Sequence, residues 1–130
     1  MKNPRPSVGA RLVALLLKTK KSKRTKYGNL KVHSEEGVFD SQAEYRRWGE
    51  LRLLEDAGKI VDLKRQVRMP LQVGEIRIGT YIADFVYLAP TDGSLKQVVE
   101  DVKGHRTQLY FWKKKHFEAQ YGFPITEVIA

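Results

Sequence analysis

The stretch from Ile76 to Lys103 constrains the fold more than any other part of the sequence. From Ile76 to Leu88, one set of alternate positions is mostly apolar, which is the period of a β-strand. The segment Pro90 to Ser94 has turn residues, and Lys96 to Lys103 then returns as a second strand. These two runs predict an antiparallel hairpin, so the fold must contain a sheet.

Alternation divides the side chains of each predicted strand between two faces. In the first strand the two sets are Ile76, Ile78, Thr80, Ile82, Asp84, Val86 and Leu88 on one face, and Arg77, Tyr81, Phe85 and Tyr87 on the other. Asp84 therefore interrupts an apolar face. In the second strand the sets are Val99, Asp101 and Lys103 against Val98, Glu100 and Val102. Asp101 and Lys103 are predicted to point the same way.

Two helices are predicted, one before and one after this hairpin. Ser41 followed by Glu44 matches a capping box, and the helix that it begins runs to about Ala57 before Gly58. A second helix begins at Thr107 and runs to about Tyr121, where Gly122 and Pro124 end it.

The remaining elements are strands. They are a small hairpin of Leu30–His33 with Gly37–Phe39, a strand or two over Ile60–Val73 broken at Pro70, and a last strand at Ile125–Ile129. The resulting order is helix, strands, hairpin, helix, strand, which predicts an α/β (α+β) fold.

Glu44 is the first anomaly on the predicted helices. On a wheel of about 100° per residue it falls on the arc that holds Trp48 and Leu51. A buried carboxylate needs a cation, a metal or a water-filled cleft beside it. Taken alone, however, Glu44 is better explained as the cap of its own helix.

Length and cysteine content narrow the class of protein. A chain of 130 residues corresponds to one small domain, and 42% hydrophobic residues are enough for one core. The absence of cysteine excludes a disulfide partner, a thiolate zinc site and a cysteine nucleophile.

Charge is concentrated at one end of the chain. The first 34 residues hold 10 of the 24 basic residues and none of the 15 acidic ones. We therefore predict a basic N-terminal arm, residues 1–26, on a nearly neutral body, residues 27–130. Its cationic residues, expected to contact DNA phosphates, include Lys18, Lys20, Lys21, Lys23, Arg24 and Lys26. The alternative is a solubilising leader.

A short apolar run, Arg11–Leu17, tests the membrane and export alternatives. It is too short to span a bilayer, which takes about 20 residues. The lysines that follow it do not fit a secretory cleavage site, which indicates a cytoplasmic protein without a membrane partner. An organelle presequence stays open, as does a short amphipathic helix at Leu12–Leu17 that docks on the body, a second protomer or DNA.

The polar interruptions suggest a metal-dependent hydrolytic site. Mg²⁺ takes one or two carboxylates plus waters and substrate phosphate, and Asp84 and Asp101 on neighbouring strands supply them. Lys103 could orient the attacking water or stabilise charge in the transition state, and Glu44 could hold a water or a second metal.

These residues resemble the motif of the PD-(D/E)XK nuclease superfamily. They are Glu44, the segment Ile82-Ala83-Asp84 and the segment Glu100-Asp101-Val102-Lys103. With Phe39-Asp40-Ser41, Gly79-Thr80-Tyr81 and Gly104 added, the chain looks like a family of short, largely uncharacterised phage and prophage nucleases of this type. The resemblance covers about residues 27–128, although no proline precedes Asp84.

The resemblance implies a restriction-endonuclease-like core, with a central mixed sheet flanked by two helices in the order helix, three strands, helix, strand. It implies magnesium-dependent cleavage of DNA, with Mn²⁺ able to substitute. Asp84, Asp101 and the Val102 carbonyl would be metal ligands, and Lys103 would lie near the nucleophile. Strand alternation favours Asp101 over Glu100 as the ligand, because only Asp101 shares a face with Lys103.

Several other residues are weaker candidates. Lys113, Lys114 and Lys115 could track phosphates or form a solvated helix face. Gln66 and His105 have ordinary surface explanations, and Tyr110, Phe117 and Tyr121 are better explained as core than as a base-stacking platform.

Two functions follow. The first is a DNA endonuclease of a phage or its bacterial host, selective for a junction, a flap or a nick. The second is a catalytically silent DNA-binding accessory module with the same fold. The superfamily includes Holliday junction resolvases, restriction-type enzymes, mismatch nickases and fork nucleases, so the fold does not choose the substrate. Cutting both strands of a symmetric substrate would call for a homodimer.

Overall fold

The structure is a computed structural model of the chain, and it describes residues 20–24 and 30–130. The chain divides into two compact units, Met1–Gly58 and Lys59–Ala130, and each is described by itself. The segment Leu12–Leu17 and the two arm residues Lys18 and Lys26 lie outside the described residues.

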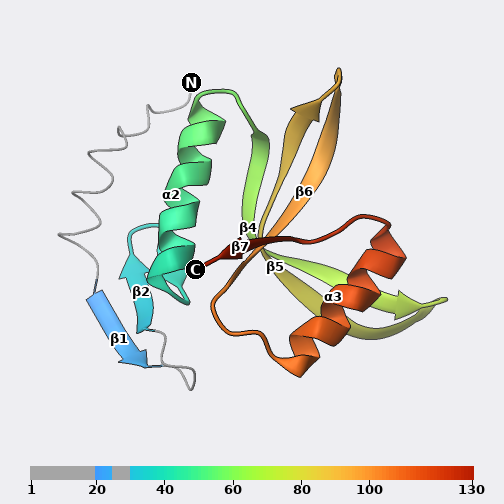
Figure 1. Ribbon diagram of the computed structural model, residues 1–130. Coiled ribbons are helices and arrows are strands. Elements are labelled where there is room, and N and C mark those ends of the chain that lie inside the picture. The colour runs from blue at the N-terminus through green and yellow to red at the C-terminus, as the bar shows by residue number, and fades with distance from the viewer. Residues whose placement is uncertain (1–19, 25–29) are drawn as a thin grey trace. The chain divides into compact units, whose positions relative to one another are not determined.

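The first unit holds a three-stranded antiparallel sheet in the order β1-β2-β3 and the helix α2 (Figure 1). β1 spans Lys20–Arg24, β2 spans Leu30–Ser34 and β3 spans Gly37–Phe39. The hairpin of β2 and β3 confirms the predicted one. The sequence did not predict β1, because five positions with only basic and serine side chains lack apolar alternation.

Helix α2 spans Gln42–Asp56 and begins as the capping box predicted. The Ser41 hydroxyl accepts a hydrogen bond from the Glu44 amide at 3.1 Å. In return, Glu44 Oε2 accepts one from the Asp40 amide at 3.3 Å. Both bonds satisfy amide groups that no helical carbonyl can reach. Gly58 follows the helix with a φ of +75°, a conformation that glycine adopts without strain.

The apolar side of α2 packs on the small sheet of its own unit. The rings of Phe39 and Tyr45 meet edge to face at 4.7 Å, and Trp48 lies 6.3 Å from Phe39. Glu36 in the β2–β3 turn accepts hydrogen bonds from Trp48 Nε1 and Arg52, both at 2.6 Å. The hairpin and the helix are thus joined by apolar and polar contacts.

The second unit holds a mixed four-stranded sheet and the helix α3 (Figure 1). Its elements are β4 Val61–Val73, β5 Ile76–Thr91, β6 Ser94–Lys103, α3 Gln108–Tyr121 and β7 Thr126–Ile129. The strand order is β4-β5-β6-β7, with only β6 and β7 parallel. The chain is therefore α+β, and its elements follow the predicted order.

The predicted hairpin of β5 and β6 is confirmed, and its turn is tight. Asp92 and Gly93 connect the strands with φ values of +46° and +81°. Two consecutive positive φ values are typical of the type I′ turn, whose twist matches that of the strands that it joins. Asp-Gly is one of the few residue pairs that adopt this turn readily.

Pro70 does not break the strand before this hairpin, contrary to the prediction. β4 is continuous, and Pro70 pairs with Thr80 of β5. Because β4 is the outer strand, the missing amide of a proline is tolerated on its outer side. The irregular positions lie elsewhere, between Val61 and Lys64 and between Leu71 and Gln72.

The prediction that alternation runs unbroken along β5 is also wrong. Tyr81, Ala83 and Val86 lie in one buried cluster, so the order of faces changes between Ala83 and Val86. The isoleucine face before this point is exposed, with Ile76 at 71% and Ile82 at 44%. β5 pairs with β4 alone in this part and gains β6 as a second neighbour only from Phe85 onward.

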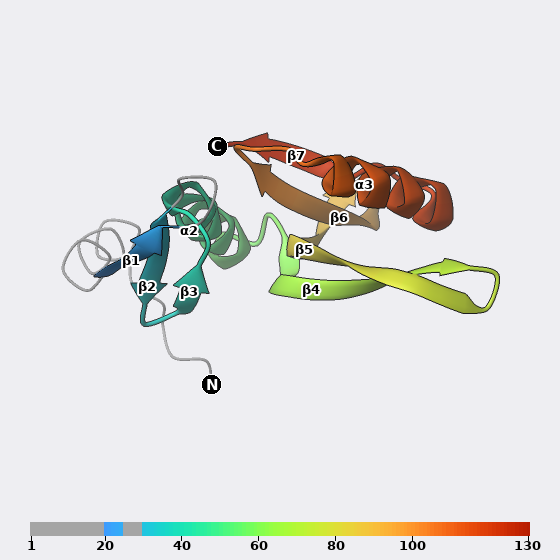
Figure 2. The same ribbon diagram turned by 90° about the horizontal axis from the view of Figure 1, so that it is seen from below.

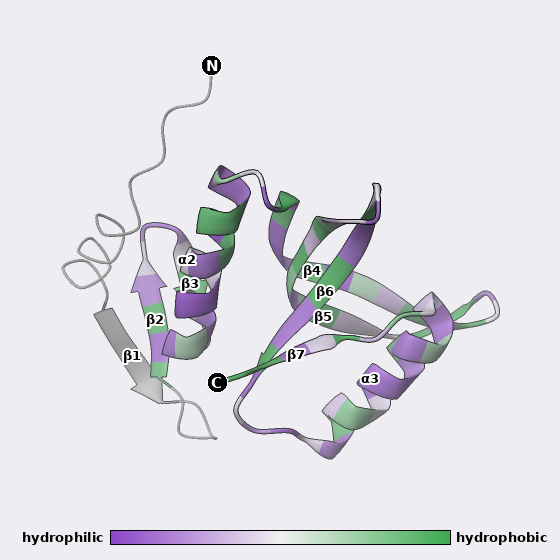
Figure 3. Ribbon diagram, turned by 45° about the horizontal axis from the view of Figure 1, so that its top comes forward, coloured by the Kyte–Doolittle hydropathy of each residue, from purple (hydrophilic) through white to green (hydrophobic). Residues whose placement is uncertain are grey.

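Helix α3 covers one side of the sheet, and the β4–β5 hairpin runs along it (Figure 2). Its inner residues Tyr110 and Phe117 are buried, as predicted. The Phe117 ring lies 5.3 Å from Tyr81 and stacks on Tyr121 at 4.5 Å. Figure 3 shows hydrophilic colour over the middle of α3 and mixed colour along the strands of the unit.

Side chains of α3 also reach the outer edge of β4. The Pro70 carbonyl accepts hydrogen bonds from the Tyr121 hydroxyl at 2.8 Å and from Gln120 at 3.2 Å. Gln120 accepts from the Gln72 amide at 2.7 Å, and His116 Nε2 lies 2.8 Å from the Gln72 carbonyl.

Neither helix of the described chain has the length and apolar character needed to cross a membrane.

Candidate functional site

Asp84 lies where β5 separates from β6. The last backbone pair between these strands is Phe85 with Glu100, and Asp84 is the neighbour of Phe85 just outside the paired region. Beyond that point the Asp84 side chain connects the two strands, because its Oδ2 accepts a hydrogen bond from the Val102 amide at 2.8 Å. A carboxylate from one strand is thus fixed against the backbone of the next.

Asp101 is buried and held at both carboxylate oxygens. Its Oδ2 accepts a hydrogen bond from the Tyr81 hydroxyl at 2.6 Å, and its Oδ1 forms an ion pair with Lys103 Nζ at 3.0 Å. Asp101 and Lys103 therefore point the same way, as predicted. Glu100 is also buried, but its carboxylate accepts from the Tyr87 hydroxyl instead. The register that pairs Asp101 rather than Glu100 with Lys103 is confirmed.

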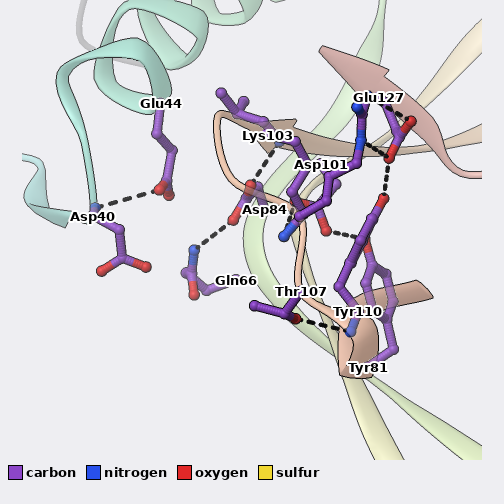
Figure 4. A network of polar contacts seen from close by, with 12 residues as sticks. Asp40, Glu44, Gln66, Tyr81, Asp84, Asp101, Lys103, Thr107, Tyr110 and Glu127 are labelled. Carbon is purple, nitrogen blue, oxygen red and sulfur yellow. Dashed lines mark hydrogen bonds and ion pairs between the residues drawn. The ribbon is translucent and has the colours of Figure 1, made fainter. Parts of the chain in front are cut away.

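Lys103 is positioned by two neighbours of different kinds. Besides the Asp101 carboxylate, its ammonium nitrogen lies 4.0 Å from the centre of the Tyr110 ring (Figure 4). A cation over an aromatic face is stabilised by about 0.5–2 kcal/mol, more where water is excluded. The Lys103 side chain is 22% exposed, so the amine is held but still reached by solvent.

A second group of polar residues holds the hydroxyl end of Tyr110. The Tyr110 hydroxyl donates a hydrogen bond to Glu127 Oε2 at 2.8 Å. Arg106 donates to both carboxylate oxygens of Glu127, at 3.3 and 3.2 Å. Glu127 lies on β7, in register with Asp101 of β6. The two parallel strands thus place one acid on Lys103 and one on the tyrosine beneath it.

These contacts set the protonation of the supporting groups. Burial and the Asp101 carboxylate raise the pKa of Tyr81 well above its ordinary value of 10.0. Burial and the hydrogen bond to Glu127 raise the pKa of Tyr110. Burial alone would raise the pKa of Glu127, but hydrogen bonds from Tyr110 and Arg106 and nearby positive charge outweigh it and lower that pKa. Both tyrosines therefore remain hydroxyl donors at neutral pH.

Glu44 belongs to the other unit. It is 3% exposed, which confirms its predicted burial, and the bonds already described make it part of the α2 cap. The structure brings Asp84, Asp101, Val102 and Lys103 together in the second unit, and Glu44 is described only within the first.

The basic residues singled out for DNA fall in two places. Lys20, Lys21, Lys23 and Arg24 make up most of β1. In α3, Lys114 is committed to an ion pair with Glu118 at 3.1 Å, one turn further along. Lys113 is half-buried and Lys115 is exposed.

The donors present fit a hard divalent cation. No group of three or more acidic or histidine side chains suited to a metal occurs in the described part of the chain. Mg²⁺, however, often binds through one or two carboxylates and keeps several waters. Asp84 and Asp101 each have one oxygen fixed by a neighbour, the Val102 amide and the Tyr81 hydroxyl respectively. Their other oxygens contact the side-chain amide of Gln66, at 3.4 Å, and the ammonium of Lys103, at 3.0 Å.

Gln66 is also strained. Its φ of +54° lies in the left-handed region, which a glutamine in a strand rarely adopts. The residue sits on β4 between Arg65 and Val67, which pair with Phe85 and Ala83 on either side of Asp84. The distorted backbone of β4 therefore lies directly across from the candidate carboxylate.

Sequence reasoning missed Tyr81, Arg106 and Glu127 as parts of this site. Tyr81 was assigned only to a face, and its contact with Asp101 depends on the tertiary packing. Glu127 had a usable signal, because a last strand placed parallel to Lys96–Lys103 puts a charged residue beside Asp101 or Lys103.

Comparison with known proteins places the chain in a family. No curated protein and no solved structure matches it. Residues 24–126 match the family described as protein of unknown function (DUF1064). That span covers both helices and most of the two sheets, including Asp84, Asp101 and Lys103. The chain belongs to the DUF1064 family.

Proposed function

We propose that this protein is a magnesium-dependent DNA endonuclease with a restriction-endonuclease-like core of the PD-(D/E)XK type. The observation that carries the proposal is the joining of Asp84 to the Val102 amide next to the ion pair of Asp101 with Lys103. Two hard carboxylates and one amine thus come from adjacent positions on neighbouring strands. Hydrolysis of a phosphodiester calls for this set of groups.

Each residue has a distinct task in this mechanism. Asp84, Asp101 and the Val102 carbonyl would hold Mg²⁺ or Mn²⁺. A bound divalent ion supplies charge neutralisation at the phosphate and lowers the pKa of its bound water. Lys103 orients the attacking water or offsets negative charge on the phosphoryl oxygens.

Tyr81 and Tyr110 act through these groups. Tyr81 fixes the Asp101 carboxylate, and Tyr110 fixes the Lys103 amine. Both are positioning residues, since each acts through Asp101 or Lys103. Well-supported neighbours of this kind keep reacting groups within the narrow geometry that catalysis requires.

The second candidate is a DNA-binding accessory module without activity. Its support is that Asp101 already has Lys103 as an ionic partner, so the buried charge is compensated without a metal. In both candidates the partner is DNA, and the basic N-terminal arm supplies affinity that does not depend on sequence.

Cleavage of labelled DNA separates the two candidates. Duplex, flap, single-stranded and four-way-junction substrates are incubated with Mg²⁺ or Mn²⁺ and, in parallel, with EDTA. We expect cleavage that EDTA abolishes and that Asp84→Asn and Lys103→Ala each reduce at least about 100-fold, with DNA binding nearly unchanged. Asp92→Asn, a carboxylate change in the exposed β5–β6 turn, is the matched control.

Two outcomes would count against the endonuclease. Cleavage that persists in Asp84→Asn and Lys103→Ala would remove the site assignment. Binding of all four substrates with no cleavage under either metal would leave the accessory module. A homodimer, as a two-strand cut requires, is tested by light scattering with and without DNA.

A further inference from the structure

Helix α3 exposes three large apolar side chains away from the core. Leu109 is 64% exposed, Phe111 44% and Trp112 72%. Tyr110, between the first two, faces inward and is buried. We call the three exposed residues, together with the exposed Lys115, the outer patch of α3. An exposed tryptophan flanked by two more apolar residues indicates a surface that binds something.

The charge of the outer patch identifies the partner. Three lysines follow Trp112 directly, and α3 holds one acid, Glu118, which is paired with Lys114. Among the described residues, neither Lys113 nor Lys115 has an ion pair. The patch therefore combines aromatic rings with uncompensated positive charge. That combination favours a nucleic acid, whose bases stack on aromatic rings while lysines neutralise its phosphates.

The aromatic rings further favour unpaired bases over a duplex. In a duplex, the base faces are stacked on each other and cannot reach a side chain, so only the lysines would be used. Trp112 and Phe111 have value as a stacking surface only if the bases are free. Figure 3 shows a hydrophobic band near the start of α3 and hydrophilic colour further along the helix.

The outer patch is physically connected to the candidate active site. The Phe111 ring lies 5.9 Å from the Tyr110 ring, and Tyr110 carries Lys103 on its face. Phe111 thus links the outer patch to the tyrosine that holds Lys103. A strand whose phosphate lies at Lys103 can place nearby bases on this patch.

We propose that the outer patch of α3 stacks unpaired bases of a DNA strand, so that the substrate class is DNA with single-stranded character near the cut. The link to cutting rests on the proposed function, whereas the binding of unpaired bases does not.

Fluorescence of Trp112 tests the binding directly. The chain has two tryptophans, and Trp48→Phe leaves Trp112 as the only one. The full-length variant is titrated in EDTA with a thymidine oligonucleotide and with a duplex of equal length. We expect the oligonucleotide to quench the emission. Trp112→Ala in the natural chain should weaken oligonucleotide binding about 5- to 100-fold and duplex binding less than about twofold.

Two further variants serve as controls. Trp112→Phe keeps an aromatic ring and should retain most of the affinity. Ile76→Ala removes an apolar side chain of similar exposure, 71%, from the β4–β5 end of the same unit and should change nothing. Circular dichroism verifies that each variant is folded.

Three results would overturn the inference. The first is an equal loss of affinity for the single strand and the duplex in Trp112→Ala, and the second is no loss of affinity in that variant. The third is a change of oligomeric state in Trp112→Ala by light scattering, which would indicate a protein contact. Because the titration contains no metal, it does not depend on cleavage. A chain that stacks bases on Trp112 but never cuts would keep this inference and lose the endonuclease.

Discussion

The Asp84 carboxylate accepts a hydrogen bond from the Val102 amide at 2.8 Å, where the ladder between β5 and β6 has already ended. A side chain therefore performs the pairing that a backbone carbonyl performs elsewhere in the sheet. The Val102 backbone is thus held by the Asp84 side chain and not by the backbone of β5. The metal site that we propose depends on this local replacement of backbone pairing by a carboxylate.

Divalent cations should stabilise the folded chain through Asp84 and Asp101. A ligand present at about 100 times its dissociation constant adds about 2.7 kcal/mol to the free energy of unfolding. We expect Mn²⁺ to raise the melting temperature of the natural chain and to have little effect on Asp84→Asn or Asp101→Asn. Thermal unfolding followed by circular dichroism measures this without any cleavage. A shift in both variants as large as in the Asp92→Asn control would rule out this metal site.

Tyr110 should influence cleavage through its ring rather than its hydroxyl. Tyr110→Phe keeps the aromatic face over Lys103, so we expect cleavage within about threefold of the natural chain, whereas Tyr110→Leu should lose roughly tenfold. Tyr121→Leu alters an aromatic residue at the other end of α3 and controls for loss of stability. Single-turnover rates on the preferred substrate distinguish the variants. Equal rates for Tyr110→Phe and Tyr110→Leu would contradict the role of the ring.

Glu127 should make stability depend on pH. Its pKa in the folded chain lies below the ordinary 4.5, so the stabilisation is fully present above 4.5 and is lost as the pH falls through the lowered value. Glu127→Gln should therefore reduce the free energy of unfolding at neutral pH, and the difference should narrow in acid. The effect will be modest, because the side chain is 22% exposed.

Urea unfolding at about pH 7 and about pH 3 measures this difference. Glu75→Gln, in the exposed turn between β4 and β5, is the control that removes a charge without these hydrogen bonds. A Glu127→Gln difference that is equal at both pH values would show that the carboxylate is not the source.

Gln66 should lower the stability of the chain through its strained backbone, but support cleavage through its contact with Asp84. Its φ of +54° is strained for glutamine but open to glycine. Gln66→Gly is expected to leave the free energy of unfolding unchanged or to raise it by up to about 1 kcal/mol, and to weaken cleavage because Asp84 loses a partner. Arg68→Gly, at an exposed β4 position without a positive φ, should instead cost about 0.5–1 kcal/mol. Equal destabilisation by the two changes would argue against strain at Gln66.

The basic arm should supply salt-dependent affinity. Replacing Lys18, Lys20, Lys21 and Lys23 with glutamine removes up to four phosphate contacts, each worth about 0.9 in the slope of log affinity against log salt for duplex DNA. We expect weaker binding and a flatter slope, with cleavage retained on saturating DNA. Lys59→Gln with Lys96→Gln, at exposed positions of the second unit, is the control. An unchanged slope would support the solubilising leader instead.

The local features of the fold were predictable because each has a signal within a few residues. Ser41 with Glu44, Asp92-Gly93 and Thr107 with Gly122 mark helix ends and a turn through backbone chemistry that needs no distant partner. The shared face of Asp101 and Lys103 follows from strand geometry alone. These are the parts of the candidate site that sequence reasoning placed correctly.

The features that were missed depend on contacts between distant segments. The change of faces in β5 falls where the strand gains β6 as a second neighbour, at Phe85. The support of Lys103 by Tyr110, and of Tyr110 by Glu127, joins β6, α3 and β7 in three dimensions. No local pattern in the sequence contains these contacts.

The bonds between α3 and the margin of β4 have a consequence for self-association. An outermost strand normally presents a row of amides and carbonyls that can template strand addition by another chain. Over Pro70 to Gln72 that row is already occupied by Gln120, Tyr121 and His116, and proline has no amide to offer. Copies of this protein should therefore not join by adding a strand to β4 along this stretch.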